Sequence, residues 1–158
     1  MRSPGSVWHA ARGTAALEFA LTLPVLLMFL AGVTDFGLLY NAQAAIAGAM
    51  TAGAQYAYLT GINVAPGNIT TVVMQASGLA VASGTQPLSV SVTGPACYCV
   101  TGAPPALTSY SCGASCPDTT PAGTYVVINA SYTYHGMMPA LSSLGVGTIT
   151  QSATVRLK

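Results

Sequence analysis

The chain has 158 residues, which is enough for one compact domain beside a membrane segment. It has only four Lys or Arg and three Asp or Glu, whereas charged residues make up about 25% of a typical domain. Nucleic-acid binding through phosphate neutralisation needs clustered cations, and these four are divided between the two ends of the chain, so we exclude that class. So little charge favours a chain held in a membrane or in an assembly, because a free soluble domain would lack electrostatic repulsion.

Residues 1–13 form a short segment before a long apolar run. The titratable side chains of this segment are all basic: Arg2, His9 and Arg12. Their position predicts a cytoplasmic N-terminus by the positive-inside rule. The run from Phe19 to Thr34 has sixteen residues and no formal charge, and with residues 14–17 it approaches the roughly 20 that cross a bilayer. We expect one membrane pass at about residues 14–36.

Two carboxylates bracket this run. Glu18 and Asp35 are seventeen residues apart, about 25 Å along a helix, and a hydrocarbon core is about 30 Å thick. A charge inside such a stretch costs roughly 2.5 to 3.5 kcal/mol on insertion scales, so Glu18 is a candidate functional residue. Asp35 marks the expected far edge of the membrane. Pro24 crowds the carbonyl of Ala20 and predicts a bend.

Helical character continues beyond Asp35. Residues 36–60 are rich in Ala and free of Pro, which predicts one helix from about Thr14 to about Leu59 that stops at Gly61. Small residues in its second half would allow close approach of another helix or of the protein's own sheet. These residues are Ala44, Ala45, Ala47, Gly48, Ala49, Ala52, Gly53 and Ala54.

The remaining residues, 61–158, predict an extracytoplasmic α+β domain. A second, shorter helix is expected from Asn68, a good N-cap residue, to Ser77. Three later segments alternate apolar and polar residues with the period of a half-buried strand: residues 88–93, 126–134 and 149–157. They predict a small antiparallel sheet of about three to four strands, with one face covered by the C-terminal half of the long helix.

Four cysteines lie in a stretch rich in Gly, Pro, Ser and Thr, which we expect to form a loop over residues 94–122. They are Cys97, Cys99, Cys112 and Cys116. Clustered, even-numbered cysteines favour disulfides and an oxidising compartment. A zinc site usually leaves two to four residues between paired ligands, whereas only Tyr98 separates the first two cysteines. Disulfides are therefore preferred to a metal, with three connectivities open.

The segment from Arg12 to Phe36 reads RGTAALEFALTLPVLLMFLAGVTDF. A Gly followed at the fifth position by Glu, opening an apolar helix behind a basic leader, resembles the processing site of type IV pilins and pseudopilins. Within that superfamily the segment is similar to the TadE-like pseudopilins of the Flp, or Tad, pilus system. The resemblance is close from Arg12 to about Tyr40. After Tyr40 it concerns only the order of elements, a helix followed by a small β domain with cysteines. The chain departs from it at Leu38, where a basic residue often stands.

The resemblance implies that residues 1–13 are a leader, which a prepilin peptidase removes between Gly13 and Thr14 on the cytoplasmic side. It also implies that Glu18 pairs with the N-terminal amine of a neighbouring subunit during assembly. The other implied partners are pilins or pseudopilins, the Tad inner-membrane platform and membrane lipid. No cofactor and no enzymatic activity are implied. We expect a minor pseudopilin of the bacterial inner membrane that helps to initiate or assemble an Flp pilus, whether it enters the fibre or stays at its base.

Other interpretations stay open at this point. A secretory signal would place cleavage at Ala42-Gln43-Ala44, but Glu18 and Pro24 argue against it. An uncleaved anchor would suit an envelope hydrolase or a thiol oxidoreductase. The residues that these activities would use are His135, Asp118 and the Cys97-Tyr98-Cys99 segment. Neither a nucleophile-elbow motif nor a thioredoxin-like pattern accompanies them, so a structural role is preferred.

Overall fold

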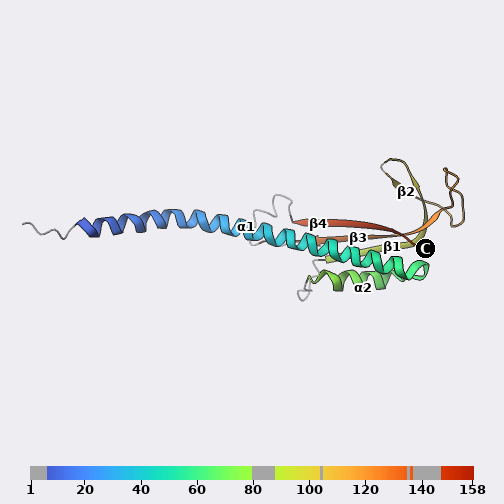
Figure 1. Cartoon of the computed structure of the whole chain (residues 1–158), viewed down its shortest axis with the longest axis horizontal. Helices are drawn as coiled ribbons and strands as arrows, with labels where there is room; N and C mark the ends of the chain where they lie inside the picture. Colours follow the sequence, from blue (N-terminus) through green and yellow to red (C-terminus); the bar gives the residue numbers. More distant parts are fainter. Residues whose placement is uncertain (1–6, 80–87, 104, 135, 137–146) are drawn as a thin grey trace, which may run out of the picture.

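The computed structural model describes residues 7–79, 88–103, 105–134, 136 and 147–158, with side chains from Ala15 onward (Figure 1). The helices are α1 (Val7–Thr60), the short 3₁₀ turn η1 (Gly61–Asn63) and α2 (Pro66–Ser77). The strands are β1 (Leu88–Thr101), β2 (Ala106–Ser109), β3 (Gly123–Thr133) and β4 (Thr148–Arg156). The predicted α+β class is therefore confirmed.

Helix α1 is longer than expected at its N-terminus. It begins at Val7 rather than Thr14, so the bond between Gly13 and Thr14 lies within the helix. It continues through Pro24 and ends at Thr60. Gly61, the expected stop, has a φ of 71°. This left-handed conformation is the one that a glycine adopts readily after the last helical turn.

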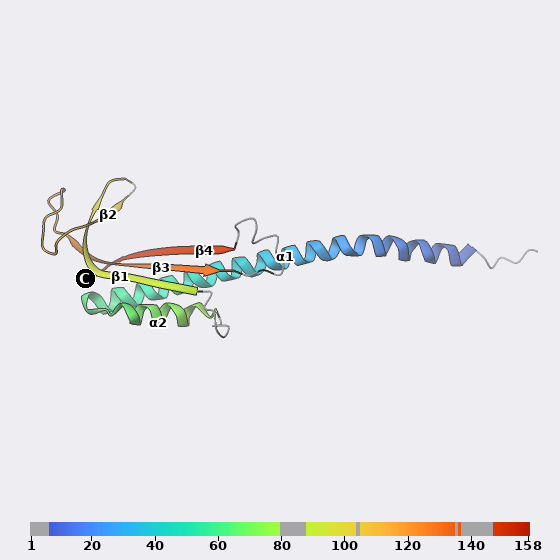
Figure 2. The same cartoon turned by 180° about the vertical axis from the view of Figure 1, so that it is seen from behind.

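The two halves of α1 have different surroundings. The N-terminal half extends away from the domain, whereas the C-terminal half lies along the sheet (Figure 1). The buried apolar residues of α1 begin only at Leu39 and recur about every three or four positions, as one face of a helix requires. They are Leu39, Ala42, Ile46, Ala49, Met50 and Ala57. The expected cover of the sheet is confirmed: α1 contacts β3 and β4, and α2 contacts β1 (Figure 2).

Helix α2 begins earlier than Asn68, and the expectation that Asn68 is the N-cap is wrong. The N-cap is Ala65, with ψ of 127°, and Pro66 is the first helical residue. A proline holds the preceding residue extended and has no amide hydrogen to leave unbonded in a first turn, which explains this start. Ile69 and Val73 of α2 are fully buried. A Cβ at Gly53 of α1 would collide with Val73 Cγ2, so glycine permits the close approach of the two helices.

The sheet is antiparallel with the strand order β2-β1-β3-β4. Strand β1 continues to Thr101, through the first part of the stretch expected as a loop. A register shift between Thr93 and Ala96 inserts one residue, and such a bulge reverses which alternate residues face the helices. Gly94 allows the bulge: its φ is 109°, and a Cβ there would lie 2.6 Å from the carbonyl oxygen of Tyr125.

The two faces of the sheet differ in chemistry. The inner face contributes Val126, Ile128 and Ala130 of β3 to the core beneath the helices. The outer face carries rows of small polar side chains, such as Ser91, Asn129 and Ser152 at paired positions. This alternation is the one that a half-buried antiparallel sheet requires.

Candidate functional site

The N-terminal half of α1 presents a continuous apolar surface. Its exposed large apolar side chains are Leu17, Phe19, Leu21, Val25, Leu26, Leu27, Met28, Phe29, Leu30, Val33, Phe36 and Leu38. Monomeric soluble proteins rarely expose a patch of this extent. Within the described residues, α1 from Ala15 onward is the one helix long and apolar enough to cross a membrane. This helix is consistent with single-pass membrane anchoring.

The threonine hydroxyls at positions 22 and 34 of this apolar stretch are bonded within the helix. The Thr22 hydroxyl donates to the carbonyl oxygens of Glu18 and Phe19 at 3.1 and 3.2 Å. The Thr34 hydroxyl donates to the carbonyl oxygen of Ala31 at 2.8 Å. Hydrocarbon offers no hydrogen-bonding partner, so internal bonding of these hydroxyls suits a membrane location.

Glu18 lies in this exposed apolar stretch, one helical turn after Thr14. Its side chain makes no hydrogen bond or ion pair with any part of the chain that the structure describes. A carboxylate in an apolar medium is costly without a counter-charge, and the described part of the chain supplies none for Glu18. The structure places Gly13 and Thr14 in the helix backbone, and their predicted role in processing stays a prediction.

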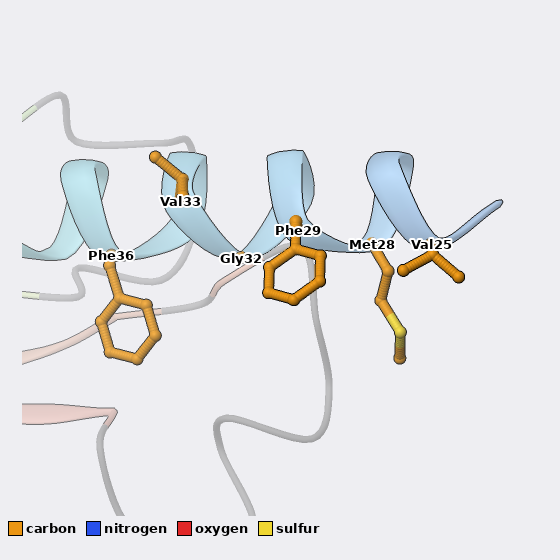
Figure 3. A pocket seen from close by; sticks show the side chains of 6 residues that line it. All are labelled: Val25, Met28, Phe29, Gly32, Val33 and Phe36. Atoms are coloured by element: carbon orange, nitrogen blue, oxygen red, sulfur yellow. The ribbon is translucent and has the colours of Figure 1, made fainter. Parts of the chain in front are cut away.

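A shallow apolar hollow lies over Gly32, with a volume of about 470 Å³. Figure 3 shows the side chains of Met28, Phe29 and Phe36 pointing to one side of the helix, with Gly32 between the two phenylalanines. The hollow is open and is lined by this single helix. Such a recess can take a lipid chain or a ridge of another helix.

Asp35 is fully buried, although it follows the exposed apolar run directly. The Tyr134 hydroxyl, just after β3, donates to the Asp35 carbonyl oxygen at 3.3 Å and lies 3.4 Å from Oδ1. A Cβ at Gly136 would lie 3.0 Å from Asp35 Oδ2. Burial, the charge of Asp35 and this hydrogen bond raise the pKa of Tyr134. The sequence indicated a boundary at Asp35 but not this tertiary contact, because nothing local relates it to residues about a hundred positions later.

The predicted disulfides are confirmed, and the structure selects one of the three connectivities. Cys97 is bonded to Cys112, and Cys99 is bonded to Cys116. The first cysteine of each pair lies on β1 and the second lies in the segment after β2, so the bridges join the strand to that segment. Among the residues that the structure describes, no group of three or more His, Cys, Asp or Glu is arranged to hold a metal ion.

The residues considered for a hydrolase are not brought into one described site. His135 lies outside the described residues. Asp118 is exposed, and its Oδ1 accepts hydrogen bonds from the Thr120 amide and hydroxyl at 3.2 and 2.7 Å. These bonds hold the pKa of Asp118 below its usual value. The local role of Asp118 is therefore to stabilise the turn that precedes β3.

Comparison with known protein families gives a match that lies entirely within α1. Residues 13–55 match the model of a family described as TadE-like protein. No curated protein and no solved structure matches the chain. The matched segment begins at Gly13, covers the exposed apolar half of α1 and extends into the half that packs on the sheet. The sheet and the disulfides lie outside it. Over residues 13–55 the chain is therefore similar to the TadE-like family, as the resemblance of the Arg12 to Phe36 segment predicted.

Proposed function

We propose that the protein is a minor pseudopilin that takes part in the initiation or assembly of an Flp-type (Tad) pilus. The observation that carries this proposal is the coincidence of two features in one segment. The TadE-like match covers residues 13–55, and the first part of this segment is an apolar helix that extends freely from the domain (Figure 1). A helix that its own domain leaves uncovered is available to lipid and to the helices of neighbouring subunits.

Processing precedes assembly in this proposal. A prepilin peptidase removes residues 1–13 on the cytoplasmic side, and Thr14 acquires a new amine. The bond to be cleaved lies in a helix, and proteases generally bind extended backbone, so the helix has to unwind locally. Gly13 favours this unwinding because glycine disfavours a helix by about 1 kcal/mol relative to alanine.

The new amine then supplies the counter-charge for Glu18. Thr14 and Glu18 of one chain are separated by one helical turn, so both lie on the same helix face. A neighbouring subunit shifted along the fibre axis can present its Thr14 amine to this carboxylate. Pairing two charges in an apolar medium offsets the desolvation cost of each, and it also fixes the axial register between subunits.

The α+β domain lies outside the cytoplasm in this proposal, where oxidising conditions maintain its two disulfides. Its role is structural rather than enzymatic, and it uses no cofactor. Partners are the peptidase, other pilins or pseudopilins, the inner-membrane platform of the Tad system and membrane lipid.

The proposal is tested by the N-terminus of the mature protein. The full chain is expressed with and without a prepilin peptidase and examined by intact mass and N-terminal sequencing. We expect a peptidase-dependent start at Thr14 and loss of Trp8, the only Trp in the chain. Gly13→Val blocks this cleavage, whereas Gly5→Ala, at the other glycine of the leader, leaves it unchanged. A start at Met1 in the presence of the peptidase, or at Ala45, contradicts the proposal.

A further inference from the structure

A cleft of about 400 Å³ lies at the end of the domain that is farthest from the free half of α1. The β2 hairpin and the segment that follows it lie at this end (Figures 1 and 2). The side chains that give the cleft its chemistry are Tyr98, Tyr125, Asp118, Thr120 and Arg156. A volume of this size, with a few convergent polar groups, falls within the range of small-molecule sites.

Charge is concentrated at this cleft to an unusual degree for this chain. After Phe36 the sequence contains only three formally charged side chains, which are Asp118, Arg156 and Lys158. Asp118 and Arg156 both line the cleft, although they come from a loop and from the end of β4. A domain that has almost no charge thus places a carboxylate and a guanidinium in one recess.

The aromatic wall of the cleft is built by the register of the sheet. Tyr125 of β3 pairs with Arg156 of β4, so the two side chains lie side by side on the outer face. The rings of Tyr98 and Tyr125 meet edge to face, with centroids 6.4 Å apart. A Cβ at Gly123 would lie 2.8 Å from the Tyr125 ring and 3.1 Å from Arg156 Nε. Glycine at this position therefore allows the ring and the guanidinium to lie over the strand.

One disulfide restrains the other wall. Cys99 and Cys116 both line the cleft and are bonded to each other. The bridge joins β1 to the turn that carries Asp118. The positions of Asp118 and Arg156 relative to each other are thus set by a covalent link and by the sheet, which lowers the entropy cost of binding a ligand.

The hydrogen-bonding capacity of the cleft is only partly used. The Arg156 guanidinium makes no hydrogen bond or ion pair with the part of the chain that the structure describes, and it has five donors. Asp118 accepts the two bonds from Thr120 through Oδ1, and its second oxygen is available as an acceptor. An anionic ligand would meet repulsion from Asp118 and a cationic ligand repulsion from Arg156, whereas a neutral ligand with neighbouring hydroxyl groups can use both.

We propose that this cleft binds one unit of a neutral saccharide. Vicinal hydroxyls of the sugar donate to Asp118 and accept from Arg156, and these bonds to charged groups are the stronger kind. The apolar C–H face of the sugar ring packs on Tyr98 and Tyr125, whose rings offer apolar area together with a polar hydroxyl. This binding site is independent of the proposed assembly function, since it uses none of the residues of the apolar helix.

The test uses the full chain in lipid nanodiscs, because sugar-based detergents would compete. The probes are lactose, cellobiose, maltose and chitobiose as neutral saccharides, with sialyllactose and a triglutamate peptide as anionic ones. Binding is measured by ligand-observed and protein-observed NMR up to millimolar concentrations. We expect at least one neutral saccharide to bind and to perturb the resonances of Tyr98 and Tyr125.

The variants separate this site from general surface binding. Arg156→Ala and Asp118→Asn are each expected to weaken saccharide binding about tenfold or more. Lys158→Ala is the matched control: it removes the other cation of the domain two residues further on, where Lys158 Nζ lies over the Tyr58 ring at 5.0 Å and outside the cleft. Unchanged thermal unfolding of each variant shows that the fold is retained. Failure of all four neutral probes to bind, binding of the anionic probes alone, or equal losses in Arg156→Ala and Lys158→Ala would each overturn the proposal.

Discussion

The Tyr134 hydroxyl oxygen lies 3.3 Å from the Asp35 carbonyl oxygen and 3.4 Å from Asp35 Oδ1, and 99 residues separate the two in sequence. This contact joins the end of β3 to the point in α1 where the exposed apolar half ends. Asp35 is fully buried there, so the domain covers the carboxylate at the expected edge of the membrane. The contact therefore fixes where the domain begins along the helix.

Tyr134→Phe removes the hydroxyl and keeps the ring. We expect a loss of about 0.5–1.5 kcal/mol in the free energy of unfolding, the usual range for one hydrogen bond. Amide hydrogen exchange is expected to become faster near Asp35 and at the end of β3. Tyr110→Phe is the control, because Tyr110 is exposed and its hydroxyl has no partner among the described residues. Equal effects of the two substitutions would show that the Tyr134 hydroxyl contributes nothing specific.

The same contact predicts an alkaline pH dependence. Burial, then the charge of Asp35 and the hydrogen bond to it, raise the pKa of Tyr134 above the ordinary value of about 10. The neutral phenol is thus favoured in the folded state, so its stabilising effect is complete below about pH 10 and is lost as the pH rises through the raised pKa. In an ultraviolet titration, one of the eight tyrosines should ionise later than an ordinary tyrosine. This late step should be absent from Tyr134→Phe.

The contrast between two glycines of α1 gives a packing test. A Cβ at Gly53 would collide with Val73 of α2, whereas a Cβ at Gly48 would meet nothing within 4 Å. Gly53→Ala should destabilise the domain by about 1–3 kcal/mol through overpacking. Gly48→Ala should be neutral or stabilising by up to about 1 kcal/mol, because alanine favours a helix. Thermal unfolding followed by circular dichroism compares the two, and equal shifts would contradict the close packing of α1 on α2.

Much of this architecture could be predicted from the sequence, because the signals are local. The apolar length of α1, the stop at Gly61 and the alternation in β3 and β4 depend on neighbouring residues. The second half of β1 was not predicted, because the bulge at Gly94 changes the phase of its alternation of inward-facing and outward-facing residues. Two features could not be predicted because they depend on tertiary contacts rather than on local sequence patterns. They are the pairing of Cys97 with Cys112 and the burial of Asp35 under Tyr134.

The small residues of α1 show the same limit. Their run allowed either packing on the protein's own domain or approach by another helix. Ala49 and Gly53 are buried against the domain, whereas Ala44, Ala47 and Gly48 are exposed. One face of this run therefore packs on the domain, and the other face is uncovered. Composition alone does not predict which of these residues lie on which face.

Removal of a disulfide should loosen the segment between β2 and β3. The Cys97–Cys112 bridge spans 15 residues, and a loop of that size corresponds to about 3 kcal/mol in the chain-entropy description. Cys97→Ala with Cys112→Ala should lower the unfolding temperature and expose residues 110–122 to limited proteolysis. Addition of a reductant should lower the unfolding temperature of the wild type. It should not change the unfolding temperature of a variant with alanine at all four cysteines. A wild type insensitive to reductant, with four free thiols, would contradict the disulfides.

The final prediction separates membrane insertion from assembly. Glu18→Gln removes the charge and keeps the size of the side chain. Because an ionised carboxylate in an apolar segment is costly, the substitution should make membrane insertion no worse, and by up to about 3 kcal/mol easier. Cleavage after Gly13 should also persist, since the glycine is unchanged. Assembly should fall sharply if Glu18 is the partner of a neighbour's N-terminal amine.

Three readouts in one strain distinguish these steps: membrane fractionation, the mass of the mature chain, and the yield of pili. Thr22→Val is the matched control, because it changes a polar side chain one turn further on whose hydroxyl is bonded only to its own helix. We expect normal values for all three in the control, and a loss of pili alone in Glu18→Gln. Normal piliation in Glu18→Gln would refute the charge pairing, whereas loss of the mature chain from the membrane would move the role of Glu18 from assembly to insertion or processing.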